Sequence, residues 1–182
     1  GINHGPNRGS LLVLSGTVGA ALAGTLLLDP PVPGFAVNAE RLNPAEPVDS
    51  PANRAQFAAV GAHFAQLVAA TRGWFCDGGT VTRGRTVLNV NYPARPVLDT
   101  RGTVVADQGG ATDLRVTFTA TGDDEYRAGT QRNDVMDSRD SDNHWLKLGY
   151  VTVTPVSGTI GDDTVPRGDL TRVLLVDAKY GW

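Results

Sequence analysis

Helical and strand-like segments alternate along the first half of the chain, and this order restricts the fold more than any other feature. Apolar residues recur every three or four positions in residues 15–27 and again from residue 51 to about residue 72, which predicts two helices. Short apolar runs at residues 35–38 and 87–92 are typical of buried strands. We therefore expect an α/β fold, in which helices cover the faces of a sheet.

Local signals set the expected ends of both helices. Ser15 and Ser50 are residues of the kind that cap a helix N-terminus, and Pro51 suits a first helical turn. The proline-rich residues 29–34 cannot continue a helix, and Gly73 is typical of a helix C-terminus. The first helix is therefore expected to end before residue 29 and the second before Gly73.

The second half of the chain favours strands. We expect a single domain in which residues 1–100 form the α/β core and residues 101–182 form a β-rich arm, a last strand and a C-terminal helix. The predicted elements there are strands at 103–106, 114–120, 125–127 and 150–155, a hairpin turn at 121–124, a short helical turn at 142–148 and a helix at 170–179.

Composition and charge exclude several classes of protein. The chain has 182 residues, 41% of them hydrophobic and 19% charged, which fits one ordinary domain with a core. The net charge of −3 is dispersed, without a block of Lys or Arg, so a nucleic-acid polymer or an anionic membrane is not an expected partner. Cys76 is the single cysteine, which excludes an intrachain disulfide and a cysteine-rich zinc site. No apolar run approaches the roughly 20 residues of a membrane span.

The strongest candidate site is the loop at residues 1–10 together with the helix that follows it. Its glycines allow close backbone approach, and Ser15, Gly16 and Thr17 would place hydroxyls and free N–H groups at a helix start, which favours phosphate. Asn3 and Asn7 offer amide oxygens to a hard cation such as magnesium. The alternative is that Ser15 only caps a helix and that the glycines and asparagines make turns. The residues by themselves leave both interpretations open.

Other polar residues are weaker candidates. His4 lies in the same loop, and His144 beside Trp145 is a candidate for a base pocket, although a surface or packing role is favoured for each. His63 is flanked by apolar residues, and Cys76 has no neighbouring histidine or aspartate pattern, so both are interpreted as structural. No serine stands in a Gly-x-Ser-x-Gly turn, which argues against a hydrolase of the Ser-His-Asp class.

Several of these motifs together resemble the SurE nucleotidase family. Residues 1–9 (GINHGPNRG) and 15–21 (SGTVGAA) are similar to the family's GIN-x-G-x-N-x-G loop and its SGTV-x-A-A helix start. Residues 88–93 (LNVNYP) and 149–155 (GYVTVTP) resemble two family strands in the right order. Ser141 and Asp142 precede the second strand, where the family commonly has Thr-Asp.

The resemblance implies a metal-dependent phosphomonoesterase that acts on nucleoside monophosphates, with a three-layer, Rossmann-like α/β core. By the same resemblance Asn3 is a ligand of Mg²⁺ or Mn²⁺, and Asn7, Ser15, Gly16 and Thr17 bind phosphate. Family members commonly form dimers or tetramers through an exchanged arm, here the hairpin at residues 114–127, and we expect the same and a cytoplasmic location.

The chain departs from the family in ways that affect its catalytic role. The family's acidic pair, which supplies most of the metal ligands, is absent, and the pair at residues 162–163 is interpreted as a solvated turn. Gly1 is not an initiator methionine, so we expect an N-terminally truncated chain, and because the acidic pair is missing we expect this chain to be inactive alone. Thr159 replaces an expected aspartate, which indicates a divergent branch. The catalytic residues stay unknown, and the alternative function is a non-catalytic module that binds phosphate or a nucleotide.

Overall fold

The computed structural model describes residue 5 and residues 7–77, 80–81, 85–111, 114–132 and 137–157. The predicted C-terminal helix at 170–179 and the acidic pair at 162–163 lie outside these residues. The described elements, in chain order, are η1 (Gly9–Leu14), α1 (Gly16–Leu27), β1 (Gly34–Ala39), α2 (Pro51–Phe75), β2 (Cys76–Asp77), β3 (Thr80–Val81), β4 (Thr86–Tyr92), η2 (Val97–Asp99), β5 (Thr103–Val105), β6 (Leu114–Gly122), β7 (Glu125–Arg132), α3 (Asp142–Lys147) and β8 (Val151–Ser157).

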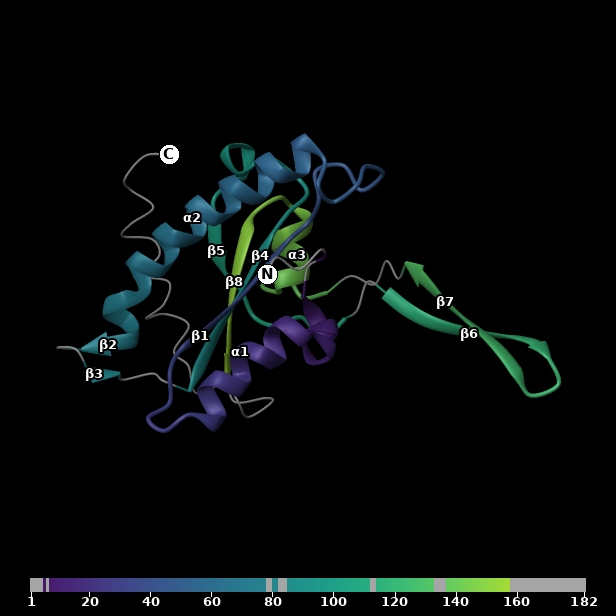
Figure 1. Cartoon of the computed structure of the whole chain (residues 1–182), viewed down its shortest axis with the longest axis horizontal. Coiled ribbons are helices and arrows are strands. Elements are labelled where there is room, and N and C mark those ends of the chain that lie inside the picture. Colours follow the sequence, from purple (N-terminus) through teal and green to yellow (C-terminus); the bar gives the residue numbers. More distant parts are fainter. Residues whose placement is uncertain are drawn as a thin grey trace.

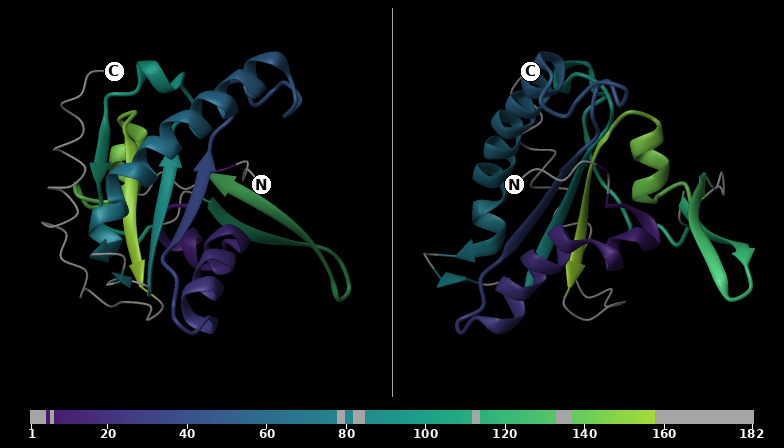
Figure 2. Two further views of the ribbon diagram at one scale, coloured as in Figure 1. Left: turned by 60° about the vertical axis from the view of Figure 1, so that its left-hand side comes forward. Right: turned by 45° about the vertical axis from the view of Figure 1, so that its right-hand side comes forward.

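The main sheet has four strands in the order β1-β4-β8-β5. β1 is parallel to β4, whereas β8 is antiparallel to β4 and parallel to β5. Helix α2 covers one face of this sheet, and α1 and α3 cover the other (Figure 2). This three-layer α/β arrangement confirms the predicted fold class. β5 and β8, from the second half of the chain, complete the sheet that β1 and β4 begin.

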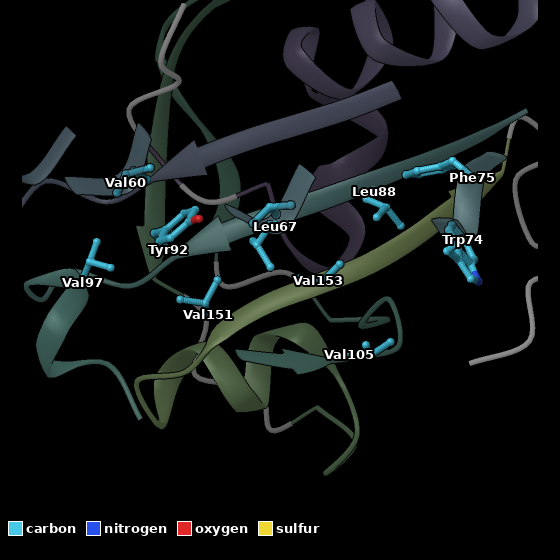
Figure 3. Close-up of a cluster of buried hydrophobic side chains, with 12 residues drawn as sticks. Val60, Leu67, Trp74, Phe75, Leu88, Tyr92, Val97, Val105, Val151 and Val153 are labelled. Atoms are coloured by element: carbon cyan, nitrogen blue, oxygen red, sulfur yellow. The ribbon is translucent and has the colours of Figure 1, made fainter. Parts of the chain in front are cut away.

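The larger core lies between α2 and the sheet (Figure 3). The side chains that α2 contributes include Val60, Leu67 and Trp74, and β4 and β8 supply the opposing apolar side chains: Leu88, Val90, Tyr92, Val151 and Val153. β4 is buried along its whole length, which confirms its prediction as a buried strand. Among the helices of the described residues, none combines the length and the apolar character needed to cross a membrane.

The prediction that α2 ends before Gly73 is wrong, because the helix continues to Phe75. Gly73 therefore lies inside the helix, which costs about 1 kcal/mol relative to alanine. The continuation buries Trp74 and Phe75, which are 5% and 3% exposed. Burying two aromatic side chains outweighs the cost of the glycine, since each contributes about 2 kcal/mol or more.

A smaller core lies on the other face, beneath α1. It contains Leu12, Val18, Ala36, Val87 and Val156. A Cβ on Gly34 would stand 3.0 Å from the carbonyl oxygen of Ala21, so helix and strand are in close contact where β1 begins. Because Val18 packs with Ala36 while Ala21 lies against Gly34, α1 runs antiparallel to β1.

The hairpin β6–β7 extends away from the sheet (Figure 1). Its second strand reaches Arg132, beyond the predicted end at residue 127. Phe118 pairs with Ala128 and Ala120 with Tyr126, so these four side chains share one face. Phe118 and Tyr126 are each 68% exposed, which leaves that face apolar and uncovered in the single chain.

Candidate functional site

Three asparagines stand on the face of the sheet that α1 and α3 cover. Asn38 belongs to β1, and Asn89 and Asn91 belong to β4. Asn38 and Asn91 are register partners, so their side chains leave the same face, and Asn89 joins them two residues away. All three are 0% exposed. Since a buried amide without a hydrogen bond is costly, each of them requires an internal partner.

Asn7, in the loop before η1, supplies those partners. Its backbone N–H donates to Asn91 Oδ1 at 2.8 Å, and its carbonyl oxygen accepts from Asn89 Nδ2 at 2.6 Å and from Asn91 Nδ2 at 3.2 Å. Its side-chain amide donates to Asn38 Oδ1. Asn38 in turn donates to Asn89 Oδ1 at 2.9 Å. The four residues form one closed network, which we call the asparagine cluster.

Gly9 is held by a second group, from α3. Its N–H lies 3.1 Å from both carboxylate oxygens of Asp142. Asp142 also accepts from the backbone N–H groups of Gly109 at 3.0 Å and Asn143 at 2.7 Å. Burial raises the pKa of Asp142 above its ordinary value, although these hydrogen bonds act in the opposite direction. Gly9 has a φ of +54°, and a Cβ there would stand 2.0 Å from the carbonyl oxygen of Ala111, so only glycine fits.

Ala111 also contacts this segment of the chain. Its carbonyl oxygen accepts from the N–H of Ser10 at 3.3 Å and from Asn143 Nδ2 at 2.9 Å. Asn143 Nδ2 also donates to Asp137 at 2.8 Å. Partial burial would raise the pKa of Asp137, but hydrogen bonds from Asn143 and from three backbone N–H groups hold it below the usual value. The loop is thus fixed by residues more than one hundred positions away.

The start of α1 is a capped helix N-terminus at the predicted residues. Ser15 is its N-cap, and Ser15 Oγ accepts from the N–H of Val18 at 3.1 Å. The N–H groups of Gly16 and Thr17 precede the first intrahelical hydrogen bonds and carry the positive end of the helix dipole. A Cβ on Gly16 would meet nothing within 4 Å, so the space beside this residue is open. The capping role predicted for Ser15 is confirmed, and binding of phosphate stays a prediction.

Several predicted site residues are placed elsewhere or not described. Asn3 and His4 lie outside the described residues. Asn7 binds the strand asparagines of the cluster, while Ser15 stands beyond η1 at the start of α1. His144 packs edge-on against Trp145, with 5.6 Å between the ring centroids. Cys76 is half-buried at the start of β2.

Acidic, histidine and cysteine side chains give no candidate divalent-metal site within the described residues. Within them, no group of three or more His, Cys, Asp or Glu side chains lies close enough to hold an ion. The amide oxygens of Asn38, Asn89 and Asn91 already accept hydrogen bonds. The Asp142 carboxylate accepts hydrogen bonds from three backbone N–H groups, which satisfy its oxygens in place of a cation. Of the two asparagines predicted to offer an oxygen to a cation, Asn3 lies outside the described residues, and Asn7 uses its Nδ2 and its backbone in the asparagine cluster.

Sequence reasoning gave no site role to Asn38, Asn89, Asn91 or Asp142. A usable signal was present, because three asparagines interrupt strands that are otherwise apolar. In a buried strand such residues need partners, and a nearby polar loop is the natural source. The partners themselves were not predictable, since Asn7 and Asn91 are 84 positions apart.

Comparison with known proteins identifies the family that the chain matches. Residues 1–113 match the family described as Survival protein SurE. A 5'-nucleotidase SurE 1 of Burkholderia lata is 33% identical over 175 residues, which cover 86% of this chain and 55% of that protein. A 5'-nucleotidase SurE of Syntrophus aciditrophicus is 32% identical over 161 residues, covering 86% of this chain and 53% of that protein.

The fold is also found in a solved structure. The crystal structure of the SurE protein from Aquifex aeolicus matches with a TM-score of 0.62 at 23% identity. The match covers 92% of this chain and 61% of the other. The chain therefore shares this fold and spans about half the length of the curated relatives that it matches.

Proposed function

Because the chain belongs to the SurE family, we propose that it is the phosphate-binding part of a 5'/3'-nucleotidase, which hydrolyses nucleoside monophosphates to a nucleoside and phosphate. The observation that supports this most directly is the start of α1, where Ser15 caps the helix and the space beside Gly16 is open. The names of the relatives, 5'-nucleotidase SurE, support the class of substrate.

The proposed roles follow from the chemistry of these groups. The N–H groups of Gly16 and Thr17 donate to phosphate oxygens, and the hydroxyls of Ser15 and Thr17 add donors that can rotate. Charge that develops on the phosphoryl oxygens during hydrolysis is stabilised by the same fixed dipoles. Asn7 supports the site by setting the path of the loop that leads to α1.

We propose a divalent metal, Mg²⁺ or Mn²⁺, as the cofactor, with Asn3 as one ligand; such an ion activates water as a nucleophile when bound. The role that we propose for the described residues is the binding of phosphate. The second candidate is a module that binds phosphate or a nucleotide without catalysis.

We also propose a cytoplasmic protein with a single SurE-like domain, whose partners are small phosphomonoesters. The uncovered apolar face of β6–β7 supports a homodimer or tetramer formed through this arm. A two-stranded ribbon is marginally stable by itself, so a second subunit is the expected support.

Two measurements test the function. Titration of this chain with inorganic phosphate, followed by calorimetry, should show binding at one site. In the protein made from the whole reading frame of its gene, 5'- and 3'-nucleoside monophosphates should release phosphate. No binding and no release would overturn the proposal, whereas binding without release would establish the non-catalytic module instead.

A further inference from the structure

The asparagine cluster bonds Asn7 through both its backbone and its side chain. Asn91 acts on the backbone, where its oxygen accepts from the N–H and its amide donates to the carbonyl oxygen. Asn89 adds a second donor to that carbonyl oxygen, and Asn38 accepts from the side-chain amide. Every one of these contacts joins the loop to β1 or to β4.

Stability of the sheet does not require such residues. On the opposite face of β4, Leu88 and Val90 pack as apolar side chains, and the Tyr92 hydroxyl lies within hydrogen-bond distance of His63. Burying amides requires that each be satisfied, and a partly satisfied network is worse than an apolar core. We therefore attribute the asparagine cluster to its hydrogen bonds with the loop and not to the stability of the sheet.

Further hydrogen bonds and buried contacts fix the backbone from Asn7 to the start of α1. Beyond Asn7, the loop is bonded at Gly9 by Asp142, and Leu12 is buried in the smaller core at 4% exposure. The N–H of Ser15 then donates to the carbonyl oxygen of Leu12 at 3.1 Å. The backbone from Asn7 to Ser15 is thus anchored at short intervals, and the direction of the first N–H groups of α1 depends on these anchors.

We infer that Asn38, Asn89 and Asn91 are positioning residues, which fix Asn7 and through it hold the start of α1 in the orientation that binds phosphate. This inference rests on the proposed function. Groups that bind a charged ligand act most strongly when the protein has already placed them, because no ordering is then needed on binding. The three asparagines do not contact the ligand themselves.

Asn91 offers the clearest test, since it bonds the backbone of Asn7 twice. The probe is inorganic phosphate, with binding measured by calorimetry and amide exchange at Asn7 and Gly9 measured by NMR. We expect Asn91→Ala to raise exchange at Asn7 at least about tenfold and to weaken phosphate binding about tenfold, as the loss of bonds to a buried group implies. Asn91→Ser, which retains one short polar group, should have a smaller effect in both measurements and covers the case in which the alanine variant does not fold.

Thr154→Val is the matched control. Thr154 is the register partner of Asn89 on the same face and is 1% exposed, and its hydroxyl has no hydrogen-bond partner within the described part of the chain. Its replacement should leave exchange at Asn7 and phosphate binding unchanged. Equal loss of phosphate binding in the Thr154→Val protein would overturn the inference, because any disturbance of this face would then suffice.

Two further outcomes are decisive. Unchanged exchange at Asn7 in both Asn91 variants would overturn the inference, and so would faster exchange with undiminished phosphate binding. If the unsubstituted chain binds no phosphate, the phosphate site of the proposed function fails and the inference falls with it. The exchange measurement then still shows whether the asparagines fix the loop, so the two failures are told apart.

Discussion

Nδ1 of His63, on α2, lies 2.7 Å from the hydroxyl oxygen of Tyr92, at the end of β4. Both side chains belong to the interior on the α2 face of the sheet, where His63 is 5% exposed and Tyr92 is 0% exposed. The rings meet nearly at right angles, with centroids 5.4 Å apart. Burial lowers the pKa of His63 to about 4 and raises that of Tyr92, so both groups are neutral at pH 7.

This pair predicts a loss of stability in mild acid. The pKa of His63 is lower in the folded chain than its ordinary value of 6.5, so the unfolded chain binds the proton first. The contribution of neutral His63 to the free energy of unfolding should be complete above about pH 6.5. It should be lost as the pH falls towards 4, by roughly 3 kcal/mol for this shift. Urea unfolding at pH 7 and pH 5, followed by fluorescence, measures the change.

His63→Gln removes the titrating group and keeps a partner for the Tyr92 hydroxyl. This variant should lose clearly less stability between pH 7 and pH 5 than the unsubstituted chain. His144→Gln, which removes a histidine outside the α2 core, should retain the original pH dependence. Identical pH dependence in the His63→Gln and unsubstituted proteins would contradict the prediction.

The hairpin predicts an effect on assembly. Val116 and Phe118 lie on the uncovered face of β6 and are 59% and 68% exposed. Replacing both with serine should weaken any subunit contact that buries them and lower the mass measured by light scattering. Thr119→Ser changes the opposite face of the same strand and serves as the control. If the double variant keeps the mass of the unsubstituted protein, the arm does not hold subunits together.

Local elements of the core were predictable because their signals are local. The periodicity at residues 15–27, which begin with the capping residue Ser15, predicted α1 and its N-cap to within one residue. The apolar run at 87–92 predicted β4, which the structure begins at Thr86. Gly73 gave a wrong end for α2, since the burial of Trp74 and Phe75 is a tertiary effect.

Long-range arrangements were not predictable in the same way. Nothing in residues 150–155 shows that β8 runs antiparallel to β4, because the direction depends on the path of the whole chain. The contact between Gly9 and Asp142 joins residues 133 positions apart, and periodicity has no signal for it. The candidate site was therefore predicted at α1, whereas the residues that hold its loop became visible only in the structure.

Metal dependence gives a further prediction. With Asn3 as the one matched metal ligand, this chain should bind Mn²⁺ weakly and release little phosphate from p-nitrophenyl phosphate, because metal sites need several placed ligands. The assay uses excess Mn²⁺ with and without a chelator, beside the protein from the whole reading frame. Rapid turnover by this chain that the chelator abolishes would contradict the prediction and would show that further ligands exist within it.

The last prediction concerns Gly16, at the first position of α1. Its backbone φ is outside the positive range and a Cβ there would meet nothing within 4 Å, so valine fits the fold and projects its branched side chain into the open space. We expect Gly16→Val to abolish binding of inorganic phosphate, and to abolish phosphate release in the protein from the whole reading frame, while circular dichroism shows unchanged helix content. Ser15→Ala is a less clean probe, since loss of the N-cap also costs about 1 kcal/mol of stability.

Gly19→Val is the matched control, because Gly19 lies on the same helix and a Cβ there also meets nothing within 4 Å. It carries the same cost of a β-branched residue in a helix but stands one turn away from the free N–H groups, so phosphate binding should be retained. Phosphate binding that survives Gly16→Val as well as it survives Gly19→Val would show that Ser15, Gly16 and Thr17 only begin a helix.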